Sequence, residues 1–220
     1  MTNYWLIVHD LPSYQQHPNK IGLNKRHAEK DKIFRTIKNG DRIIYYAKDK
    51  EVLGIFKVVS NMHPSDRGCW GGKAGDHFVY DTEPVYVSPM GMPTPIDTTK
   101  YGIKSLHGRT AVRLTHSQFK GIKSEILGMD DPVSESGVVC MFSKMYQFLG
   151  FPFLKSIQNR FPDCVAVNNS GKEVKIEFEE PSDKFDHDPK KCDLVVCWKD
   201  TLGSLSEVQI LELSDFVYGH

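Results

Sequence analysis

The first 130 residues alternate between short apolar runs and turn-forming segments, a pattern typical of a β-rich domain. The runs are rich in β-branched and aromatic residues, and segments with proline, glycine and asparagine separate them. Strands have this composition, and such turn residues end them. The predicted strands are Tyr4–His9, Arg42–Lys48, Val52–Val59 and His77–Val87, and the predicted loops are 11–20, 65–76 and 88–97.

Helical periodicity interrupts this pattern in a few places. The apolar spacing predicts a short helix over 28–37 and a longer one over 117–127. Thr115 is placed to cap the N-terminus of the longer helix. A single helical turn is predicted at 103–108.

The second half begins where apolar periodicity disappears, over residues 130–137, and this places a domain boundary there. Beyond it the sequence predicts a helix over 138–160 interrupted near Gly150, a hairpin over 163–180, and strands over 193–198 and 206–213. This order predicts an α+β chain of two domains, 1–129 and 138–220, joined by a linker at 130–137.

Charge separates the two halves, although the whole chain is neutral. Residues 1–127 carry 19 Lys and Arg against 12 Asp and Glu, a net of +7. Residues 128–220 carry 9 against 16, a net of −7. A basic domain attracts a polyanion, and an acidic domain repels one unless it binds metal. Two ordinary domains with unequal surfaces would give the same split.

Targeting signals and disulfides are not expected. The sequence contains no run of about 18 apolar residues that could span a membrane. Its first residues lack the charged start and apolar run of a signal peptide. The five cysteines are therefore expected to be reduced thiols, and the protein is expected to be cytoplasmic.

Carboxylates gather on the predicted hairpin at 163–180. Side chains alternate along a strand, so Glu177 and Glu179 project to one side, with Lys175 farther along it. The turn at 168–171 would bring Asp163 back towards them. Converging carboxylates repel unless a cation sits among them, and Mg²⁺ prefers oxygen ligands. The other interpretation is the solvated face of an edge strand.

The first half resembles the EVE family of PUA-like barrels. The resemblance rests on short motifs, namely Tyr4-Trp5-Leu6, Ile21-Gly22-Leu23, Gly40-Asp41-Arg42, Gly54-Ile55-Phe56 and the ending Leu114…Phe119…Ile122. It implies a curved β-barrel with flanking helices and a pocket that reads a modified base flipped out of DNA or RNA. The residues that the resemblance places in this pocket are Trp5, Ile21, Gly22, Asn24, Trp70, Ser105 and Leu106.

Some of these residues have a second interpretation. Ile21 stands where the family often has an aromatic residue. Trp5 lies in an apolar run and is equally expected in the core. Trp70 lies in a glycine-rich loop, where a binding role explains a tryptophan better than packing does. The basic run at 25–27 is also explained as a solvated helix face.

The second half resembles the PD-(D/E)XK nucleases. Pro162-Asp163 followed by Glu177-Phe178-Glu179 carries the resemblance, with Glu179 where the family usually has a lysine. It implies a small α/β domain with a mixed sheet, in which Asp163 and Glu177 ligate Mg²⁺ or Mn²⁺ and the metal activates a water.

The same resemblance suggests roles for further residues. Glu179 would complete the metal shell or orient the water, and Lys175 would supply the missing cation. His187 could transfer a proton, because its pKa lies near neutrality, and Asp193 could act as a further acid. A loop role for His187 and a turn role for Asp193 remain open. Cys164, Cys192 and Cys197 with His187 raise a zinc site, although their spacing lacks a CxxC motif.

Together these features predict a modification-dependent DNA endonuclease of the restriction type. The N-terminal pocket would capture a modified base of double-stranded DNA, and the C-terminal domain would cleave nearby with Mg²⁺ or Mn²⁺. A homodimer would supply the two active sites for double-strand cleavage. The alternative is a non-catalytic reader of modified DNA or RNA, whose C-terminal half is a degenerate nuclease fold used for dimerisation. The missing motif lysine favours the alternative, whereas the retention of Asp163, Glu177 and Glu179 together favours the enzyme.

Overall fold

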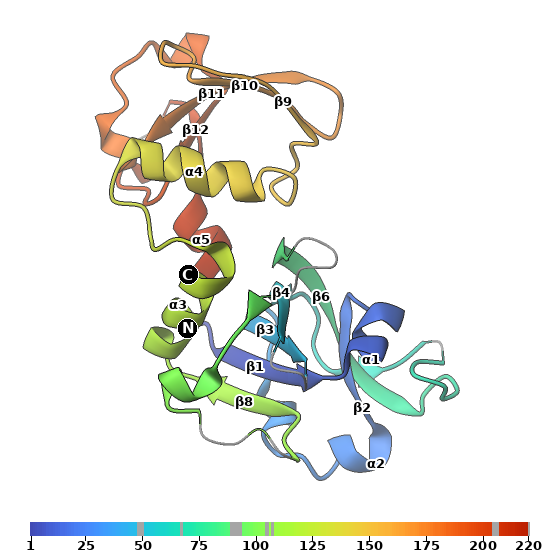
Figure 1. The fold of residues 1–220 in the computed structure, drawn as a ribbon. Coiled ribbons are helices and arrows are strands. Elements are labelled where there is room, and N and C mark those ends of the chain that lie inside the picture. Colours follow the sequence, from blue (N-terminus) through green and yellow to red (C-terminus); the bar gives the residue numbers. More distant parts are fainter. Residues whose placement is uncertain are drawn as a thin grey trace. The chain divides into compact units, whose positions relative to one another are not determined.

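The computed structural model divides the chain into two compact units, residues 1–128 with Gly219, and residues 129–218. It describes residues 1–47, 51–66, 68–88, 94–103, 106, 108–203 and 207–219. Each unit has its own sheet, so the predicted α+β class is confirmed (Figure 1). Among the described residues, none of the helices has the length and apolar character needed to cross a membrane.

A curled sheet forms most of the first unit (Figure 1). Its strand order is β2-β6-β4-β3-β1-β8, with β5 on β6 and β7 on β4. β1 and β3 run parallel, whereas β1 and β8, and β3 and β4, run antiparallel. The strands are β1 Tyr4–His9, β2 Lys20–Asn24, β3 Arg42–Ala47, β4 Glu51–Val58, β5 His63–Pro64, β6 His77–Val87, β7 Thr94–Pro95 and β8 Ala111–Leu114.

The core of this unit explains why its strands have continuous apolar runs. Every residue of β3 is buried, and a strand that is buried on both faces loses its polar alternation. Aromatic rings meet edge to face in the core, with centroids 4.8 Å apart for Tyr45 and Phe56 and 5.2 Å apart for Phe34 and Tyr80. β6 continues through Pro84, where its pairing with β4 shifts register.

Short helices connect the strands, and two predictions about them are wrong. No helix covers 28–37, because the Asp31 carboxylate accepts the N–H groups of Ile33 and Phe34 and starts a separate turn. The loop predicted at 11–20 contains α1, which Asp10 caps by accepting the Ser13 N–H. The helices are α1 Leu11–Gln16, α2 Lys25–Ala28, η1 Phe34–Thr36, η2 Thr98–Tyr101 and α3 His116–Leu127.

The last helix of the unit, α3, confirms the prediction for 117–127. Thr115 and Gln118 form a capping box at its N-terminus. Gly128, with a φ of +64°, ends it in the left-handed conformation that favours glycine. The helical turn predicted at 103–108 falls largely outside the described residues.

The second unit is a mixed five-stranded sheet with α4 against it (Figure 1). Its strand order is β13-β12-β11-β10-β9, parallel from β11 to β13 and antiparallel from β9 to β11. Phe142 of α4 packs against Phe178 of β11, with ring centroids 5.2 Å apart. The elements are α4 Glu135–Met145, β9 Phe153–Ile157, β10 Cys164–Val167, β11 Glu173–Glu179, η3 Ser182–Lys184, η4 Pro189–Lys191, β12 Leu194–Cys197, β13 Gln209–Glu212 and α5 Leu213–Tyr218.

Two predicted elements of this unit differ from the structure. The helix predicted over 138–160 begins earlier, at Glu135, because Ser134 caps it, and it ends at Met145. Residues 153–157 form the edge strand β9, which pairs with β10. The last predicted strand ends at Glu212, because Leu213 begins α5, and its predicted start at Ser206 lies outside the described residues.

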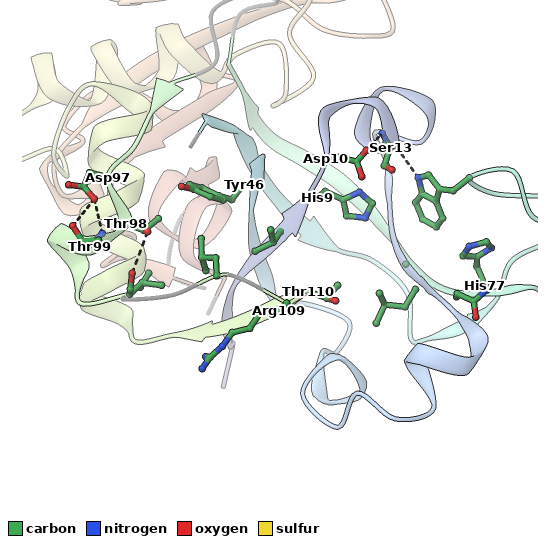
Figure 2. Close-up of a pocket in the computed structure, with 18 residues that line it drawn as sticks. His9, Asp10, Ser13, Tyr46, His77, Asp97, Thr98, Thr99, Arg109 and Thr110 are labelled. Carbon is green, nitrogen blue, oxygen red and sulfur yellow. Dashed lines mark hydrogen bonds between the residues drawn. The ribbon is translucent and has the colours of Figure 1, made fainter. Parts of the chain in front are cut away.

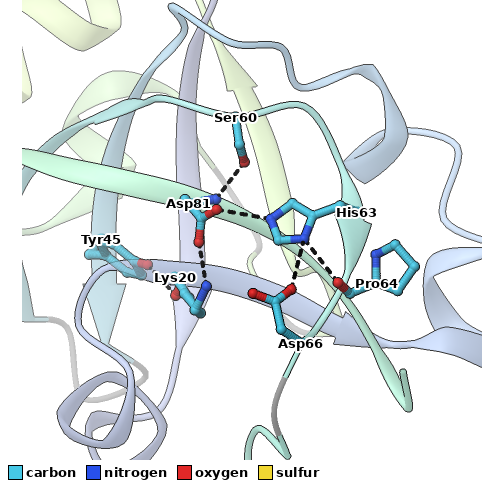
Figure 3. Close-up of polar contacts among 7 residues, drawn as sticks. All are labelled: Lys20, Tyr45, Ser60, His63, Pro64, Asp66 and Asp81. Atoms are coloured by element: carbon cyan, nitrogen blue, oxygen red, sulfur yellow. Dashed lines mark hydrogen bonds and ion pairs between the residues drawn. The ribbon is translucent and has the colours of Figure 1, made fainter. Parts of the chain in front are cut away.

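A polar cluster around Asp81 ties β2, β5 and β6 of the first unit together (Figure 3). Asp81 pairs with Lys20 of β2, and its Oδ2 lies 2.9 Å from His63 Nε2 of β5. Its N–H donates to Ser60 Oγ at 2.8 Å. Burial alone would raise the pKa of Asp81, but the hydrogen bonds from Lys20 and His63 outweigh burial and lower it. The cluster fixes the start of β2, which leads to the candidate site.

Candidate functional site

A cavity of about 860 Å³ lies in the first unit, lined by the ends of β1, β2 and β3 and by the segments around η2 and Trp70 (Figure 2). Its lining combines aromatic, hydroxyl, imidazole and charged side chains. Sites for small molecules and cofactors commonly measure about 300–1,000 Å³. The cavity is therefore the candidate binding site of this unit.

Trp70 forms one wall of the cavity. Its φ of +47° lies in the left-handed region, which is rare for a bulky residue. Its indole N–H donates to the Ser13 carbonyl at 2.9 Å. A Cβ on Gly22 would lie only 2.6 Å from the indole ring, so glycine allows the ring to rest on the backbone of β2. These contacts hold the indole in place before any ligand arrives.

Histidines surround the same indole. The ring centroids of His9, His17 and His77 lie 5.5, 5.3 and 5.4 Å from that of Trp70. Burial lowers the pKa of His77 and outweighs the opposing charge of Asp76. His77 is therefore neutral at neutral pH, and this end of the cavity offers aromatic surface to a ligand.

The structure separates the residues predicted for the base pocket into two groups. Those that line the cavity are Gly22, Asn24, Trp70 and Leu106. Trp5 and Ile21 lie instead in the hydrophobic core, 2% and 0% exposed, because the strands that carry them are buried at these positions. The Trp5 indole donates to Asp41 Oδ2 at 2.8 Å, which satisfies its N–H inside the core. Ser105 lies outside the described residues.

Sequence reasoning missed His9, Tyr46, His77 and Arg109, which also line the cavity. His9 and Tyr46 lie near the C-terminal ends of β1 and β3, and the parallel pairing places Tyr46 opposite Val8. A polar residue that ends an apolar run was the available signal for both. Arg109 lies in a segment without periodicity, and nothing in its spacing indicated a site.

In the second unit, the structure brings Asp163 and Glu177 together. The Asp163 N–H donates to Glu177 Oε2 at 3.3 Å, and the Phe178 N–H donates to Asp163 Oδ2 at 3.0 Å. His187 Nε2 lies 3.3 Å from Glu177 Oε1. Glu177 is only 5% exposed, so it does not lie on a solvated strand face. We call Asp163, Glu177, Glu179 and His187 the acidic edge.

Burial sets the protonation of this edge. It raises the pKa of Glu179 from 4.5 to about 7, and the charges of Glu135 and Glu177 act in the same direction. Burial, followed by the charge of Asp163, also raises the pKa of Glu177. Glu179 is therefore partly protonated at neutral pH.

Lys175 and Asp193 link two strands of this sheet. The Lys175 N–H donates to Asp193 Oδ2 at 2.8 Å, and the Asp193 N–H donates to the Lys175 carbonyl at 3.0 Å. The Lys175 side chain is exposed. These reciprocal bonds join β11 to the residue that precedes β12, so Asp193 links two parallel strands.

The acidic edge places two of the predicted ligands, Asp163 and Glu177, next to each other. The described ranges contain no group of three His, Cys, Asp or Glu side chains placed to hold a metal ion. Asp163 and Glu177 each accept one backbone N–H through one carboxylate oxygen. Mg²⁺ prefers near-octahedral oxygen ligands, so Asp163 and Glu177 are the residues that would hold it.

Cys164, Cys192 and Cys197 are buried thiols, whereas Cys140 of the same unit is exposed. Burial raises the pKa of Cys164 to about 11 and that of Cys197 to about 12. The Cys192 thiol donates to the Leu194 carbonyl at 3.3 Å. Zinc binds thiolates, and these surroundings disfavour the thiolate.

Comparison with protein families assigns the first unit. A model of the EVE domain matches residues 3–119, just over half of the 220-residue chain. The match covers most of the segments that line the cavity and contains no residue of the second unit. No curated protein matches the chain.

Several solved structures are similar to just over half of the chain. Rpa0253 from Rhodopseudomonas palustris is 14% identical, with a TM-score of 0.35, over 57% of this chain and 93% of its own. Atu2648 from Agrobacterium tumefaciens is 18% identical, with a TM-score of 0.39, over 60% and 97%. The YTH domain-containing protein mmi1, solved with RNA, is 14% identical, with a TM-score of 0.40, over 57% and 82%.

Proposed function

The chain belongs to the EVE domain family, and on this premise we propose that it is a reader of modified DNA or RNA. The reader binds a modified nucleobase in the cavity of the first unit, with the base against Trp70. The observation that carries the proposal is a preformed indole wall inside a cavity of about 860 Å³. Stacking of a base on an aromatic side chain contributes about 1–3 kcal/mol.

Polar groups in the cavity can also offset the free energy of flipping a base out of a duplex. Flipping a base out of a duplex costs a few kcal/mol, which stacking and hydrogen bonds to the base edge must offset. Asn24 and Ser13 supply polar groups beside Trp70 in the same cavity. Residues 1–127 carry a net charge of +7, which attracts a polyanion to this unit.

Trp70→Ala tests this proposal. It should weaken binding of the preferred oligonucleotide by about 5- to 150-fold, the equivalent of one lost stack of about 1–3 kcal/mol. Fluorescence anisotropy with labelled single- and double-stranded DNA and RNA measures the affinity. The oligonucleotides carry 5-methylcytosine, 5-hydroxymethylcytosine, N6-methyladenine or no modification.

Phe153→Ala is the matched control, since Phe153 is a 60%-exposed aromatic residue of the second unit. It should leave the affinity unchanged. An equal affinity of the Trp70→Ala variant and the unchanged protein would rule out stacking on Trp70. The absence of binding to every oligonucleotide would refute the reader.

A second candidate function is phosphodiester cleavage by the second unit, acting as a homodimeric restriction-type endonuclease on double-stranded DNA. The juxtaposition of Asp163 and Glu177 favours it. The described arrangement of the acidic edge does not hold three metal ligands, so we derive no catalytic step from it. In the reader, the second unit instead serves dimerisation.

Incubation of modified DNA with Mg²⁺ or Mn²⁺ separates the two candidates. An endonuclease would cut the DNA, and Glu177→Ala would abolish the cutting. A reader would bind the same DNA and leave it intact under every condition. Sedimentation of the protein at several concentrations measures the dimer that both candidates require.

A further inference from the structure

The cavity has two chemically different ends (Figure 2). His9, Asp10, Ser13 and His77 lie at one end, which is also the end that Trp70 walls. Tyr46, Thr98 and Thr99 lie at the other end, with Asp97 beside them. Between the two ends lie Arg109 and Thr110. We call these the indole end and the hydroxyl end.

The size of the cavity exceeds what one base requires. Its volume of about 860 Å³ lies near the top of the range of about 300–1,000 Å³ that drug-sized ligands occupy. A single nucleobase is smaller than such a ligand. One base against Trp70 therefore fills the indole end and leaves the hydroxyl end for another group.

Hydrogen bonds hold the hydroxyl end in a fixed arrangement. Asp97 caps η2 by accepting the N–H and the hydroxyl of Thr99, at 3.0 and 2.7 Å. Thr98, only 7% exposed, donates to the Ile103 carbonyl at 3.4 Å. Tyr46 lines the cavity at the same end, and burial raises the pKa of its hydroxyl. Hydroxyl and carboxylate groups suit the hydroxyls of a sugar and the edge of a base, and a carboxylate disfavours phosphate.

Arg109 supplies the charge that a phosphate requires. It is exposed, and no ion pair joins it to any residue that the structure describes. The next residue, Thr110, accepts the N–H of Val8 at 2.9 Å, and Val8 is paired with Tyr46. These contacts fix the Arg109 segment alongside the floor of the cavity. Arginine binds phosphate oxygens through its planar set of donors.

We infer that the cavity binds two consecutive nucleotides of one strand. The base of the first rests on Trp70, the phosphate that joins the two contacts Arg109, and the sugar and base of the second occupy the hydroxyl end. The inference rests on the proposed function and defines its ligand as a dinucleotide unit, so a free base or nucleoside uses only half of the site.

Calorimetric titration of matched ligands tests the inference. The ligands are nucleosides of 5-methylcytosine, 5-hydroxymethylcytosine and N6-methyladenine, and dinucleoside monophosphates that contain the same bases. The dinucleotide should bind at least about tenfold tighter than its nucleoside, because it adds one charge-assisted contact. Arg109→Gln should weaken the dinucleotide about tenfold and leave the nucleoside unchanged.

Two further variants complete the experiment. Lys57→Gln removes the same charge from an exposed position of β4 away from the cavity lining, and should change neither affinity. Tyr46→Phe, which keeps the packed ring, should weaken the dinucleotide alone.

The outcomes separate this inference from the function on which it rests. Equal affinities for nucleoside and dinucleotide, with Arg109→Gln behaving like Lys57→Gln, would overturn the two-nucleotide site and leave the reader intact. No binding of any nucleoside, dinucleotide or modified oligonucleotide would overturn both. Circular dichroism of each variant verifies that it is folded.

Discussion

The cavity of the first unit and the acidic edge of the second differ in the surroundings of their polar side chains. In the cavity, residues from several separate elements face a space of about 860 Å³. In the acidic edge, Glu177 and Glu179 are 5% and 9% exposed, and their neighbours are other carboxyl groups, one histidine and the backbone. The cavity leaves room for a ligand, whereas burial in the acidic edge raises the pKa values of Glu177 and Glu179.

This difference separates a preformed space from a close cluster of buried carboxyl groups. Asp163 and Glu177 meet as the sequence pattern predicts, yet their oxygens accept backbone N–H groups. A metal ion needs several oxygens directed at one point. The cavity, in contrast, is lined by residues from separate segments that the fold assembles, and the family resemblance placed only Gly22, Asn24, Trp70 and Leu106 there.

Gly22→Val should give the largest effect, because it fills the space that the Trp70 indole occupies. A Cβ at this position lies 2.6 Å from the indole and 2.8 Å from Val79. Such overpacking should lower the free energy of unfolding by about 3 kcal/mol and reduce ligand binding. Urea denaturation measures the change.

A double-mutant cycle with Trp70→Ala serves as its control. If the clash is with the indole, the cost of Gly22→Val should be much smaller in the Trp70→Ala background. Equal costs in both backgrounds would show that the clash with Val79, and not the clash with the indole, determines the loss of stability.

Glu179→Gln should give the second largest effect, and with a defined pH dependence. The pKa of Glu179 is about 7 in the folded protein against 4.5 ordinarily, so folding takes up a proton between these values. Stability therefore falls as pH rises from about 4.5 to 7, and removal of the carboxylate prevents this loss. A rise in pH from 4.5 to 8 should therefore lower the free energy of unfolding of the unchanged protein by about 2 kcal/mol more than that of the Glu179→Gln variant.

Urea denaturation at a series of pH values measures this slope. Glu173→Gln on the same strand is the control, because Glu173 is exposed and paired with Lys155. The Glu173→Gln variant should leave the dependence of the free energy of unfolding on pH unchanged. A slope that is unchanged in Glu179→Gln would show that this carboxyl group ionises normally.

Asp81→Asn should give the smallest effect, with the opposite dependence on pH. The pKa of Asp81 is lowered, so its ion pairs stabilise the fold above about pH 4 and this stabilisation is lost as pH falls through the folded pKa. The site is partly exposed, so the loss at pH 7 should be only about 0.5 kcal/mol.

The difference between Asp81→Asn and the unchanged protein should disappear once the pH lies below the lowered pKa of Asp81. The control Asp66→Asn changes an 82%-exposed carboxylate that lies 3.9 Å from His63, and it should have almost no effect. A larger loss of stability for Asp66→Asn than for Asp81→Asn would show that Asp66, and not Asp81, is the main partner of His63.

Four strands of the first unit, β1, β3, β4 and β6, could be predicted because their apolar runs are bounded by turn residues. The strands β2 and β8 were missed because their apolar runs are too short. The side chains that line the cavity could not all be predicted, since burial on both faces hides which side chains point inward. Trp5 illustrates this, because an apolar run looks the same whether its tryptophan packs in the core or lines a pocket. Residues 153–157 were predicted as helix because they follow a helix and contain too few residues to show strand alternation.

The three tryptophans of the chain lie in three different surroundings. Trp5 is enclosed in the core of the first unit, Trp70 lies against the cavity among histidines, and Trp198 is buried in the second unit. The protein therefore carries its own set of optical probes. A change in emission when a ligand is added reports on Trp70, whereas Trp5 and Trp198 keep constant spectra until their own unit unfolds. Single replacements by phenylalanine assign each signal, so binding and the unfolding of each unit can be followed without any attached dye.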